Sequence, residues 1–225
     1  MKVMSDPQSP PVYSVFIVDD HPLVREWLTT LITQQADLIV VGEAESAPEA
    51  LEKIEKLQPD VIIVDITLAS GSGLELVKDL RPIAHNSKII MLSMHDELTY
   101  AERALRAGAR GYVSKRESTK KMVSAIRQVL EGKLFISDEM KELMTEKFLG
   151  GTGGVTTVEE LSDRELEVFR RLGQGKDTRD IADQLHISIK TVQVYCARIK
   201  EKFKLGTHTD LLREAMRWCD SGLIK

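Results

Sequence analysis

The stretch that decides the fold is residues 59–76, PDVIIVDITLASGSGLEL. Four apolar residues, Val61 to Val64, run directly into the carboxylate of Asp65. An uninterrupted apolar run of this kind predicts a strand that is buried on both faces, as in a parallel sheet. A carboxylate at the end of a buried strand is costly unless a cation or a hydrogen-bond donor pairs with it. The rest of the chain should therefore supply a partner for Asp65.

Apolar runs of the same kind alternate with helical patterns from Val12 to about Glu131. We expect strands in YSVFIV, LIVVGEAE, DVIIVD, SKIIMLS and GYV. Helical spacing of apolar residues recurs near 22–34, 46–57, 73–80, 97–107 and 118–131, and Gly132 suits a C-cap. This alternation predicts a doubly wound, flavodoxin-like, five-stranded parallel sheet with helices on both faces. Sites in such folds lie at the carboxyl ends of the strands.

The pattern changes in the second half of the chain. The segment FLGGTGGVTTVEE is rich in glycine and threonine and marks a boundary. We expect one domain over 12–132, a linker over 133–158 in which SDEMKELMTEKF could form a short helix, and a second domain over 159–220. The second domain shows only helical patterns, at about 162–173, 178–185, 189–203 and 208–218, which predict an all-α domain of four helices. Ser162 and Glu165 fit a capping box.

Composition is that of an ordinary globular protein, with 225 residues, 42% hydrophobic and 29% charged. No window approaches the roughly 18 consecutive apolar residues of a membrane span, and MKVMSDPQSPP lacks the apolar core of a secretory signal. The two cysteines, Cys196 and Cys219, do not make a disulfide framework, and this favours a reducing environment. We therefore expect a cytoplasmic protein without a membrane partner.

Three carboxylates are predicted to meet at one edge of the sheet. If the first and third strands end at Val18 and Val64, then Asp19, Asp20 and Asp65 lie at adjacent strand ends. Converging carboxylates repel one another and need a cation, and oxygen-only ligands suit Mg²⁺, which often binds beside a phosphate. An aspartate can attack phosphorus to give an acyl phosphate. Such a transfer depends on positioning and charge neutralisation.

Two further polar residues follow strands at the same edge. Lys115, after the fifth predicted strand, could reach the site as a compact cation, and the hydroxyl of Ser93, at the end of the fourth, could bond a phosphoryl oxygen. Asp and Ser at strand ends are also common loop and capping residues. Five polar residues at the ends of four strands favour a site over that alternative.

Residues 14–131 resemble a response-regulator receiver domain, because VDDH, VDITLASGSGLEL, LSMHD and GARGYVSK match its blocks in order and spacing. The resemblance implies that Asp65 accepts phosphate and that Asp19, Asp20 and the carbonyl of Thr67 join Asp65 in holding the metal ion. It also implies a switch role for Ser93 and Tyr112 and phosphate contact by Lys115.

The chain departs from this family pattern at three positions near the site. Ala69 stands where family members usually carry proline, so the loop after Asp65 should be less rigid. Thr67 lies beside the reacting phosphorus, and the bulky Met94 follows the switch serine. None of these departures removes a required charge. His21 precedes Pro22 at a helix start, and we do not expect it to be a metal ligand.

The C-terminal stretch TRDIADQLHISIKTVQVYCARIKEKF contains two helical patterns separated by a short turn. Ser188 fits an N-cap of the second helix. Net charge is −4 for the chain, yet residues 186–204 carry five basic side chains and one acidic side chain. Two short helices, a tight turn and a basic second helix predict a DNA-binding helix-turn-helix. A solvated helix in a plain bundle would explain the charges but not the turn.

Residues 159–217 resemble the LuxR/NarL-type DNA-binding domain through LSDRELEVFRRLGQGKDTRDIADQLHISIKTVQVYCARIKEKF. The resemblance places a recognition helix at about 189–203. It implies base contacts from Gln193, Val194 and Ala197, and phosphate contacts from Lys190, Thr191, Arg198 and Lys202. The family's histidine two residues after the first base-facing position is Tyr195 here, so the resemblance does not carry that contact over.

Together the two resemblances predict a two-component response regulator of the NarL/FixJ type, a transcription regulator and not an enzyme. A sensor histidine kinase would donate the phosphoryl group to Asp65 with Mg²⁺, and a homodimer of the phosphorylated protein would bind double-stranded DNA. One rival is an aspartyl-phosphate hydrolase, which needs a second aspartate where Thr67 stands. The other is a regulator that works without phosphorylation, which the intact Asp19, Asp20, Asp65 and Lys115 disfavour.

Overall fold

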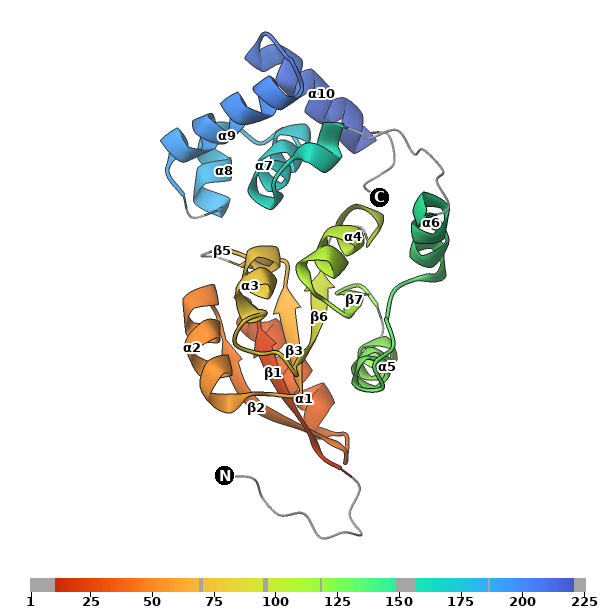
Figure 1. The fold of residues 1–225 in the computed structure, drawn as a ribbon. Coiled ribbons are helices and arrows are strands. Elements are labelled where there is room, and N and C mark those ends of the chain that lie inside the picture. The colour runs from red at the N-terminus through yellow and green to blue at the C-terminus, as the bar shows by residue number, and fades with distance from the viewer. Residues whose placement is uncertain are drawn as a thin grey trace.

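The computed structural model describes residues 11–68, 71–94, 97–117, 119–148, 157–185 and 187–220. An α/β unit forms the N-terminal part, and a helical unit forms the C-terminal part (Figure 1). Ala69, in the loop after Asp65, lies outside the described residues.

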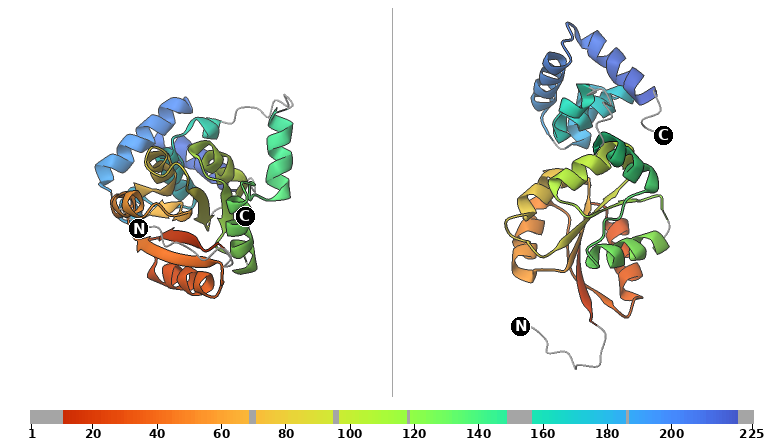
Figure 2. Two further views of the ribbon diagram at one scale, coloured as in Figure 1. Left: turned by 60° about the horizontal axis from the view of Figure 1, so that its bottom comes forward. Right: turned by 45° about the vertical axis from the view of Figure 1, so that its right-hand side comes forward.

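A five-stranded parallel sheet is the centre of the N-terminal unit, as the alternating pattern predicted. Its order is β2-β1-β3-β6-β7. The strands are β1 (Tyr13–Val18), β2 (Leu38–Ala44), β3 (Val61–Asp65), β6 (Lys88–Ser93) and β7 (Gly111–Ser114). All residues of β3 are buried, because helices cover both faces of this central strand (Figure 2).

Five helices cover the sheet: α1 (Pro22–Thr33), α2 (Ala47–Leu57), α3 (Gly73–Leu80), α4 (Glu97–Ala107) and α5 (Thr119–Leu130). Alternate residues of each strand serve opposite faces. Val15, Ile17 and Ile63 pack with α1 and α5, whereas Phe16 and Val64 belong to the cluster of α2, α3 and α4. After β3 the chain makes two short antiparallel strands, β4 (Thr67–Leu68) and β5 (Gly71–Ser72), before α3 begins.

The segment that follows α5 packs on the sheet, which differs from the expectation of a linker beginning at residue 133. The backbone of Phe135 pairs with β7 and with the residue before it: Tyr112 N–H donates to Phe135 O at 2.8 Å, and Phe135 N–H donates to Arg110 O at 2.9 Å. The helix α6 (Asp138–Phe148) then packs against α4, with Met140 fully buried. This segment covers the edge strand, whose backbone groups would otherwise need water or another chain as partner.

The C-terminal unit is helical, as predicted, and consists of a 3₁₀ turn η1 (Thr157–Glu160) followed by α7 (Asp163–Gly173), α8 (Thr178–Gln184), α9 (Ile189–Lys202) and α10 (His208–Asp220). The predicted capping box at the start of α7 is present, and the Ser188 side chain accepts a hydrogen bond from Thr191 N–H at the start of α9. Over the described residues, every helix is too short or too polar to cross a lipid bilayer.

The two units touch through α4 and α7, and we call this the interdomain contact. The Arg103 guanidinium of α4 donates to Leu161 O at 2.6 Å and to Val158 O at 2.8 Å, and lies 3.2 Å from Asp163. Lys78 of α3 also pairs with Asp163, at 3.0 Å. Asp163 is buried, so these two cations offset its desolvation.

Tyr100, on the same face of α4, is 1% exposed and lies among the charged residues of α7. Burial raises the pKa of its hydroxyl to about 12, so the side chain is neutral at any physiological pH. The apolar cluster beneath the contact is continuous from the sheet into the C-terminal helices. The interdomain contact is therefore a packed interface with a charged rim.

We expect Arg103→Met to open the interdomain contact, because it removes two hydrogen bonds to carbonyls and one ion pair while keeping most of the apolar stem. Hydrogen bonds from a charged group are worth about 1.5–3 kcal/mol each, so the ratio of closed to open molecules should fall about tenfold or more. Small-angle scattering of the full chain should report a larger radius of gyration.

The matched control is Arg106→Met on the same helix, because the Arg106 guanidinium pairs with Glu102 one turn away within α4 and is 79% exposed. This variant should scatter like the wild type. Equal expansion of both variants, or of neither, would contradict the role of Arg103 in holding the two units together.

Candidate functional site

The three carboxylates expected at the sheet edge do come together. Asp19 and Asp20 follow β1, Asp65 ends β3, and ligand atoms from these residues and His21 all lie within 4.8 Å of one another. His21, which we did not expect to be a metal ligand, lies in this group. His21 is the N-cap residue of α1, as its place before Pro22 suggested, but its Nδ1 also lies 2.7 Å from Asp20 Oδ1.

Lys115 binds two of these carboxylates from the loop after β7. Its Nζ lies 2.6 Å from Asp19 Oδ2 and 2.7 Å from Asp65 Oδ2. The ammonium is only 10% exposed, and the two carboxylates are almost fully buried. The backbone N–H of Lys115 donates to Ser93 O at 2.7 Å, which fixes the start of this loop against the end of β6. One cation thus serves two anions that the sheet places side by side.

One lysine does not neutralise the cluster, and the pKa of Asp65 reflects this. Burial, together with the neighbouring charge of Asp19, raises the pKa of the Asp65 carboxyl from 3.8 to about 6, although Lys115 and the N–H of Thr67 oppose the shift. The site therefore has room for more positive charge. A cation would lower the pKa of Asp65 and keep its carboxylate ionised.

The donor set fits a hard divalent cation. Asp19 Oδ2 pairs with Lys115 and Asp20 Oδ1 pairs with His21, and each carboxylate oxygen has a further lone pair with which it could bind a metal ion. All the carboxylate donors are oxygens, which Mg²⁺ prefers. Thr67 N–H donates to Asp65 Oδ1 at 3.3 Å, so the backbone of Thr67 also lies beside the cluster.

The two expected switch residues lie on the two strands that follow β3 in the sheet, Ser93 on β6 and Tyr112 on β7. The β3–β6 register pairs Asp65 with Leu92, so Ser93 is one residue further along β6. Ser93 and Tyr112 are 1% and 3% exposed. Tyr112 packs in the same apolar cluster as Tyr100 of the interdomain contact. Any movement of the Tyr112 ring therefore starts from a buried position.

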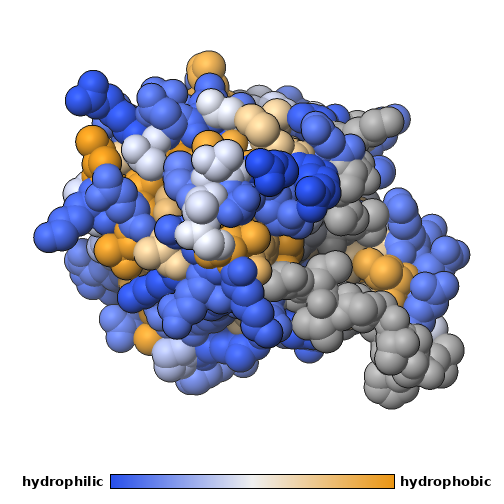
Figure 3. Space-filling model, turned by 90° about the horizontal axis from the view of Figure 1, so that it is seen from above, coloured by the Kyte–Doolittle hydropathy of each residue, from blue (hydrophilic) through white to orange (hydrophobic). Residues whose placement is uncertain are grey.

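The expected DNA-reading side chains occupy the outer side of α9. Val192, Cys196 and Ile199 face the domain core, whereas Lys190, Gln193, Val194, Ala197 and Arg198 are exposed and Thr191 is half-buried. The interdomain contact involves α7 and η1 and leaves this outer side open. Figure 3, which looks down on the C-terminal helices, shows a mainly hydrophilic surface with scattered apolar side chains.

Lys202 differs from the other expected phosphate contacts. Its Nζ lies 2.6 Å from Glu165 Oε2 and donates to Glu160 O at 2.9 Å. Glu165 is buried and belongs to the capping box of α7, and hydrogen bonds from Lys202 and Ser162 lower the pKa of its carboxyl despite burial. Lys202 therefore neutralises a buried carboxylate within its own domain, and a phosphate would have to compete with that ion pair.

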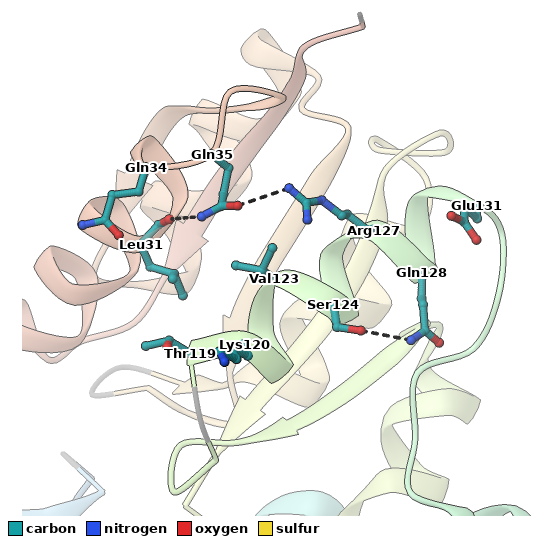
Figure 4. A pocket seen from close by; sticks show the side chains of 10 residues that line it. All are labelled: Leu31, Gln34, Gln35, Thr119, Lys120, Val123, Ser124, Arg127, Gln128 and Glu131. Carbon is teal, nitrogen blue, oxygen red and sulfur yellow. Dashed lines mark hydrogen bonds between the residues drawn. The ribbon is translucent and has the colours of Figure 1, made fainter.

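A hollow of about 630 Å³ lies elsewhere, between the end of α1 and the length of α5 (Figure 4). Arg127 donates there to Gln35, and Ser124 accepts a hydrogen bond from Gln128. None of the lining residues belongs to the carboxylate cluster. The hollow is therefore separate from the carboxylate cluster at the strand ends.

Comparison with known families assigns both units. Residues 15–127 match the response regulator receiver domain, and residues 159–215 match the bacterial regulatory proteins of the luxR family. The chain belongs to the NarL/LuxR-type response regulators, which are phosphorylation-dependent transcription regulators.

Individual relatives match over almost their whole length. The transcriptional activator protein ExaE of Pseudomonas putida is 34% identical over 94% of this chain and 98% of its own length. The oxygen regulatory protein NreC of Staphylococcus carnosus is 32% identical over 90% of this chain and 96% of its own. Among solved structures, RcsB of Salmonella enterica serovar Typhimurium, bound to promoter rprA, matches with a TM-score of 0.60 and 26% identity, over 90% of this chain and 97% of that one.

The raised pKa of Asp65 predicts how stability depends on pH. Because the pKa of Asp65 is higher in the folded than in the unfolded state, ionising this carboxyl destabilises the folded state. The destabilisation is complete above about pH 6 and is absent well below pH 4, where the carboxyl is protonated in both states. Asp65→Asn removes this cost. Without Mg²⁺, its free energy of unfolding should exceed that of the wild type by up to about 3 kcal/mol near neutral pH, and the gain should shrink toward pH 4.

Urea denaturation at several pH values measures this difference. Asp37→Asn is the control with the opposite sign, because its hydrogen bond with Arg127 lowers the pKa of Asp37. That variant should gain no stability at neutral pH. A gain for Asp65→Asn that stays constant with pH would contradict the raised pKa.

Proposed function

We propose that Asp65 is the residue through which this regulator is phosphorylated, with Mg²⁺ held by Asp19, Asp20, Asp65 and the carbonyl of Thr67. The observation that carries the proposal is the buried ion pair of Lys115 with both Asp19 and Asp65, in which one positive charge faces two negative charges. A bound Mg²⁺ would supply that charge and draw a phosphoryl group to the carboxylate.

The residues of the chain have distinct tasks in the transfer. An Asp65 oxygen attacks the phosphorus of a phosphohistidine, the new O–P bond forms as the N–P bond breaks, and the imidazole leaves with the electron pair. Lys115 contacts the incoming phosphoryl oxygens as a point charge. The Ser93 hydroxyl, one residue beyond the partner of Asp65 in the sheet, turns toward the phosphoryl group and donates to it. The protein acts on itself and takes the phosphoryl group from a sensor histidine kinase.

DNA binding is assigned to the C-terminal domain. We place DNA contacts on the outer side of α9, with Gln193, Val194 and Ala197 toward base edges and Lys190, Thr191 and Arg198 toward phosphates. RcsB is solved both on promoter DNA and as dimers bound to DNA, and this supports a homodimer of the phosphorylated chain on paired half-sites about 10 base pairs apart. Because DNA is the target, the protein works in the cytoplasm.

A route from Asp65 to the second domain passes along α4. Ser93 ends β6, α4 begins a few residues later, and Tyr100 and Arg103 of α4 make the interdomain contact. A phosphoryl group adds about −2 charge beside Ser93. Movement of Ser93 and Tyr112 toward it would shift α4 and loosen its hold on α7. Phosphorylation would then release the second domain for pairing without having to uncover α9.

The chemical proposal predicts where phosphate is attached. Acetyl phosphate with Mg²⁺ should add one phosphoryl group to the wild type, because the small donor needs only the ionised Asp65 and its cations. Asp65→Asn should gain none, as measured by intact-protein mass spectrometry and by separation on a phosphate-binding gel. The matched variant is Ser93→Ala, which keeps every charge of the site.

Ser93→Ala should accept the phosphoryl group yet respond less in a gel-shift assay on paired half-sites. Labelling of Asp65→Asn at the wild-type level would move the acceptor to another residue. A full DNA-binding response by Ser93→Ala would mean that its hydroxyl is not the switch.

We expect substitutions of Arg198 and Gln193 on α9 to affect DNA binding in different ways. Each phosphate contact contributes about −0.9 to the slope of log K against log salt, so Arg198→Gln should weaken binding to all sequences and flatten that slope by about one unit. Gln193→Ala should change base preference instead, by about 1–3 kcal/mol for the preferred base. Salt titrations of fluorescence anisotropy on several duplexes distinguish these outcomes.

Lys202→Met is the informative comparison. Because Lys202 neutralises the buried Glu165, its loss should lower the melting temperature of the C-terminal domain. A normal melting temperature with a flattened salt slope would assign Lys202 to the phosphates, as the family resemblance implies. An unchanged slope in Arg198→Gln would place the DNA elsewhere.

A further inference from the structure

Arg25 is a half-buried cation that lies next to the carboxylate cluster and has no role in the proposed chemistry. It lies in the first turns of α1, and its side chain is 17% exposed. Its Nη1 donates to the backbone carbonyl of Asp19 at 2.7 Å. The guanidinium thus reaches back from the helix to the peptide that joins Asp19 to Asp20.

The other side of the guanidinium is anchored on β2. Arg25 Nε lies 3.3 Å from Glu43 Oε2, and Glu43 Oε1 accepts a hydrogen bond from Thr29 at 2.7 Å. The backbone carbonyl of Glu43 in turn accepts from Lys53 Nζ of α2 at 2.9 Å. Glu43 is therefore held in place, and the planar guanidinium of Arg25 links it to the start of α1.

The backbone of Asp19 is consequently held at both ends. Its N–H donates to Ala44 O at 3.1 Å, and its carbonyl accepts from Arg25. The orientation of the peptide between Asp19 and Asp20 decides where the two carboxylates point. Mg²⁺ demands near-ideal geometry at short distances, so a small rotation of this peptide would spoil the ligand set.

We propose that Arg25 is a positioning residue that sets the Mg²⁺ affinity of the site by holding the Asp19–Asp20 peptide against β2. This inference rests on the proposed Mg²⁺ site. Arg25 touches neither the phosphoryl group nor a carboxylate of the cluster, and acts through a main-chain carbonyl. Partners that orient metal ligands typically change metal affinity by about 10–100-fold when they are removed.

The positive charge of Arg25 would instead weaken Mg²⁺ binding, because a nearby cation repels Mg²⁺. The two effects differ in sign, so the direction of the change in affinity distinguishes them. If positioning dominates, loss of Arg25 weakens Mg²⁺ binding. If repulsion dominates, loss of Arg25 strengthens it.

The test compares the full-length wild type with Arg25→Met, Arg25→Lys and the matched control Arg127→Met. Arg127 also pairs with an acidic residue, Asp37, across two elements of the receiver, but is not part of the carboxylate cluster. Ligand binding raises thermal stability according to the ratio of free ligand to Kd. Melting curves over a range of MgCl₂ at constant ionic strength therefore give a Kd without any phosphorylation.

We expect the Mg²⁺ Kd of Arg25→Met to rise about tenfold or more, and that of Arg127→Met to stay at the wild-type value. Arg25→Lys keeps the charge but offers one donor group instead of a fork, so it should recover the affinity only in part. With acetyl phosphate, the Mg²⁺ concentration for half-maximal labelling should rise in the same proportion, while the rate at saturating Mg²⁺ stays near the wild-type rate.

Two outcomes would overturn the inference: an unchanged Kd in Arg25→Met, or a lower one. Should Arg25→Met fail to fold, Glu43→Gln replaces it, because this variant removes the ion pair but keeps the hydrogen bond from Thr29 possible, and a Kd unchanged from wild type would again contradict the proposal. Asp20→Ala shows whether the proposed Mg²⁺ site exists at all. If the wild type binds Mg²⁺ no better than Asp20→Ala, the proposed site fails, and this failure is distinct from that of Arg25.

Discussion

The ion contacts of Lys115 are the constraint on which the receiver depends. Asp19 follows β1 and Asp65 ends the neighbouring strand β3, so the parallel sheet brings the two carboxylates together although their charges repel. One ammonium from the loop after β7 offsets part of that repulsion. The remainder raises the pKa of Asp65 to about 6. The same imbalance that costs stability is what the proposed Mg²⁺ would offset.

Surrounding elements hold this cluster in a fixed geometry. Arg25 and Ala44 hold the backbone of Asp19, and the N–H of Lys115 holds the end of β6. Beyond β6 the chain enters α4, whose Tyr100 and Arg103 meet the C-terminal domain. The charged site and the interdomain contact are thus joined by one strand and one helix, which is a short path for a local change of charge to reach the second domain.

The C-terminal domain keeps its outer surface available while it is held by α7. Its interior is stabilised by the packing of Val192, Cys196 and Ile199, and by the ion pair of Lys202 with Glu165. The basic charge of α9 therefore divides into a structural part and an exposed part. The exposed part includes Lys190 and Arg198, which we propose contact DNA, whereas Lys202 stabilises the domain.

The sequence by itself determined the order of strands and helices, since buried strands show as apolar runs and helices as periodic ones. It also determined which carboxylates meet, because strand ends in a parallel sheet share an edge. It did not determine partners that depend on side-chain reach across the fold. Lys202 looks like any exposed basic residue of α9 until α7 places Glu165 beside it. No periodic pattern reveals the contacts of Arg25, Phe135 and Arg103. Each of these residues hydrogen-bonds to main-chain groups, which for Arg25 lie in the turn before its helix and for the other two lie far away in the sequence. Tertiary structure decided those contacts, since hydrogen bonds to the backbone leave no trace in the identity of the residue that accepts them.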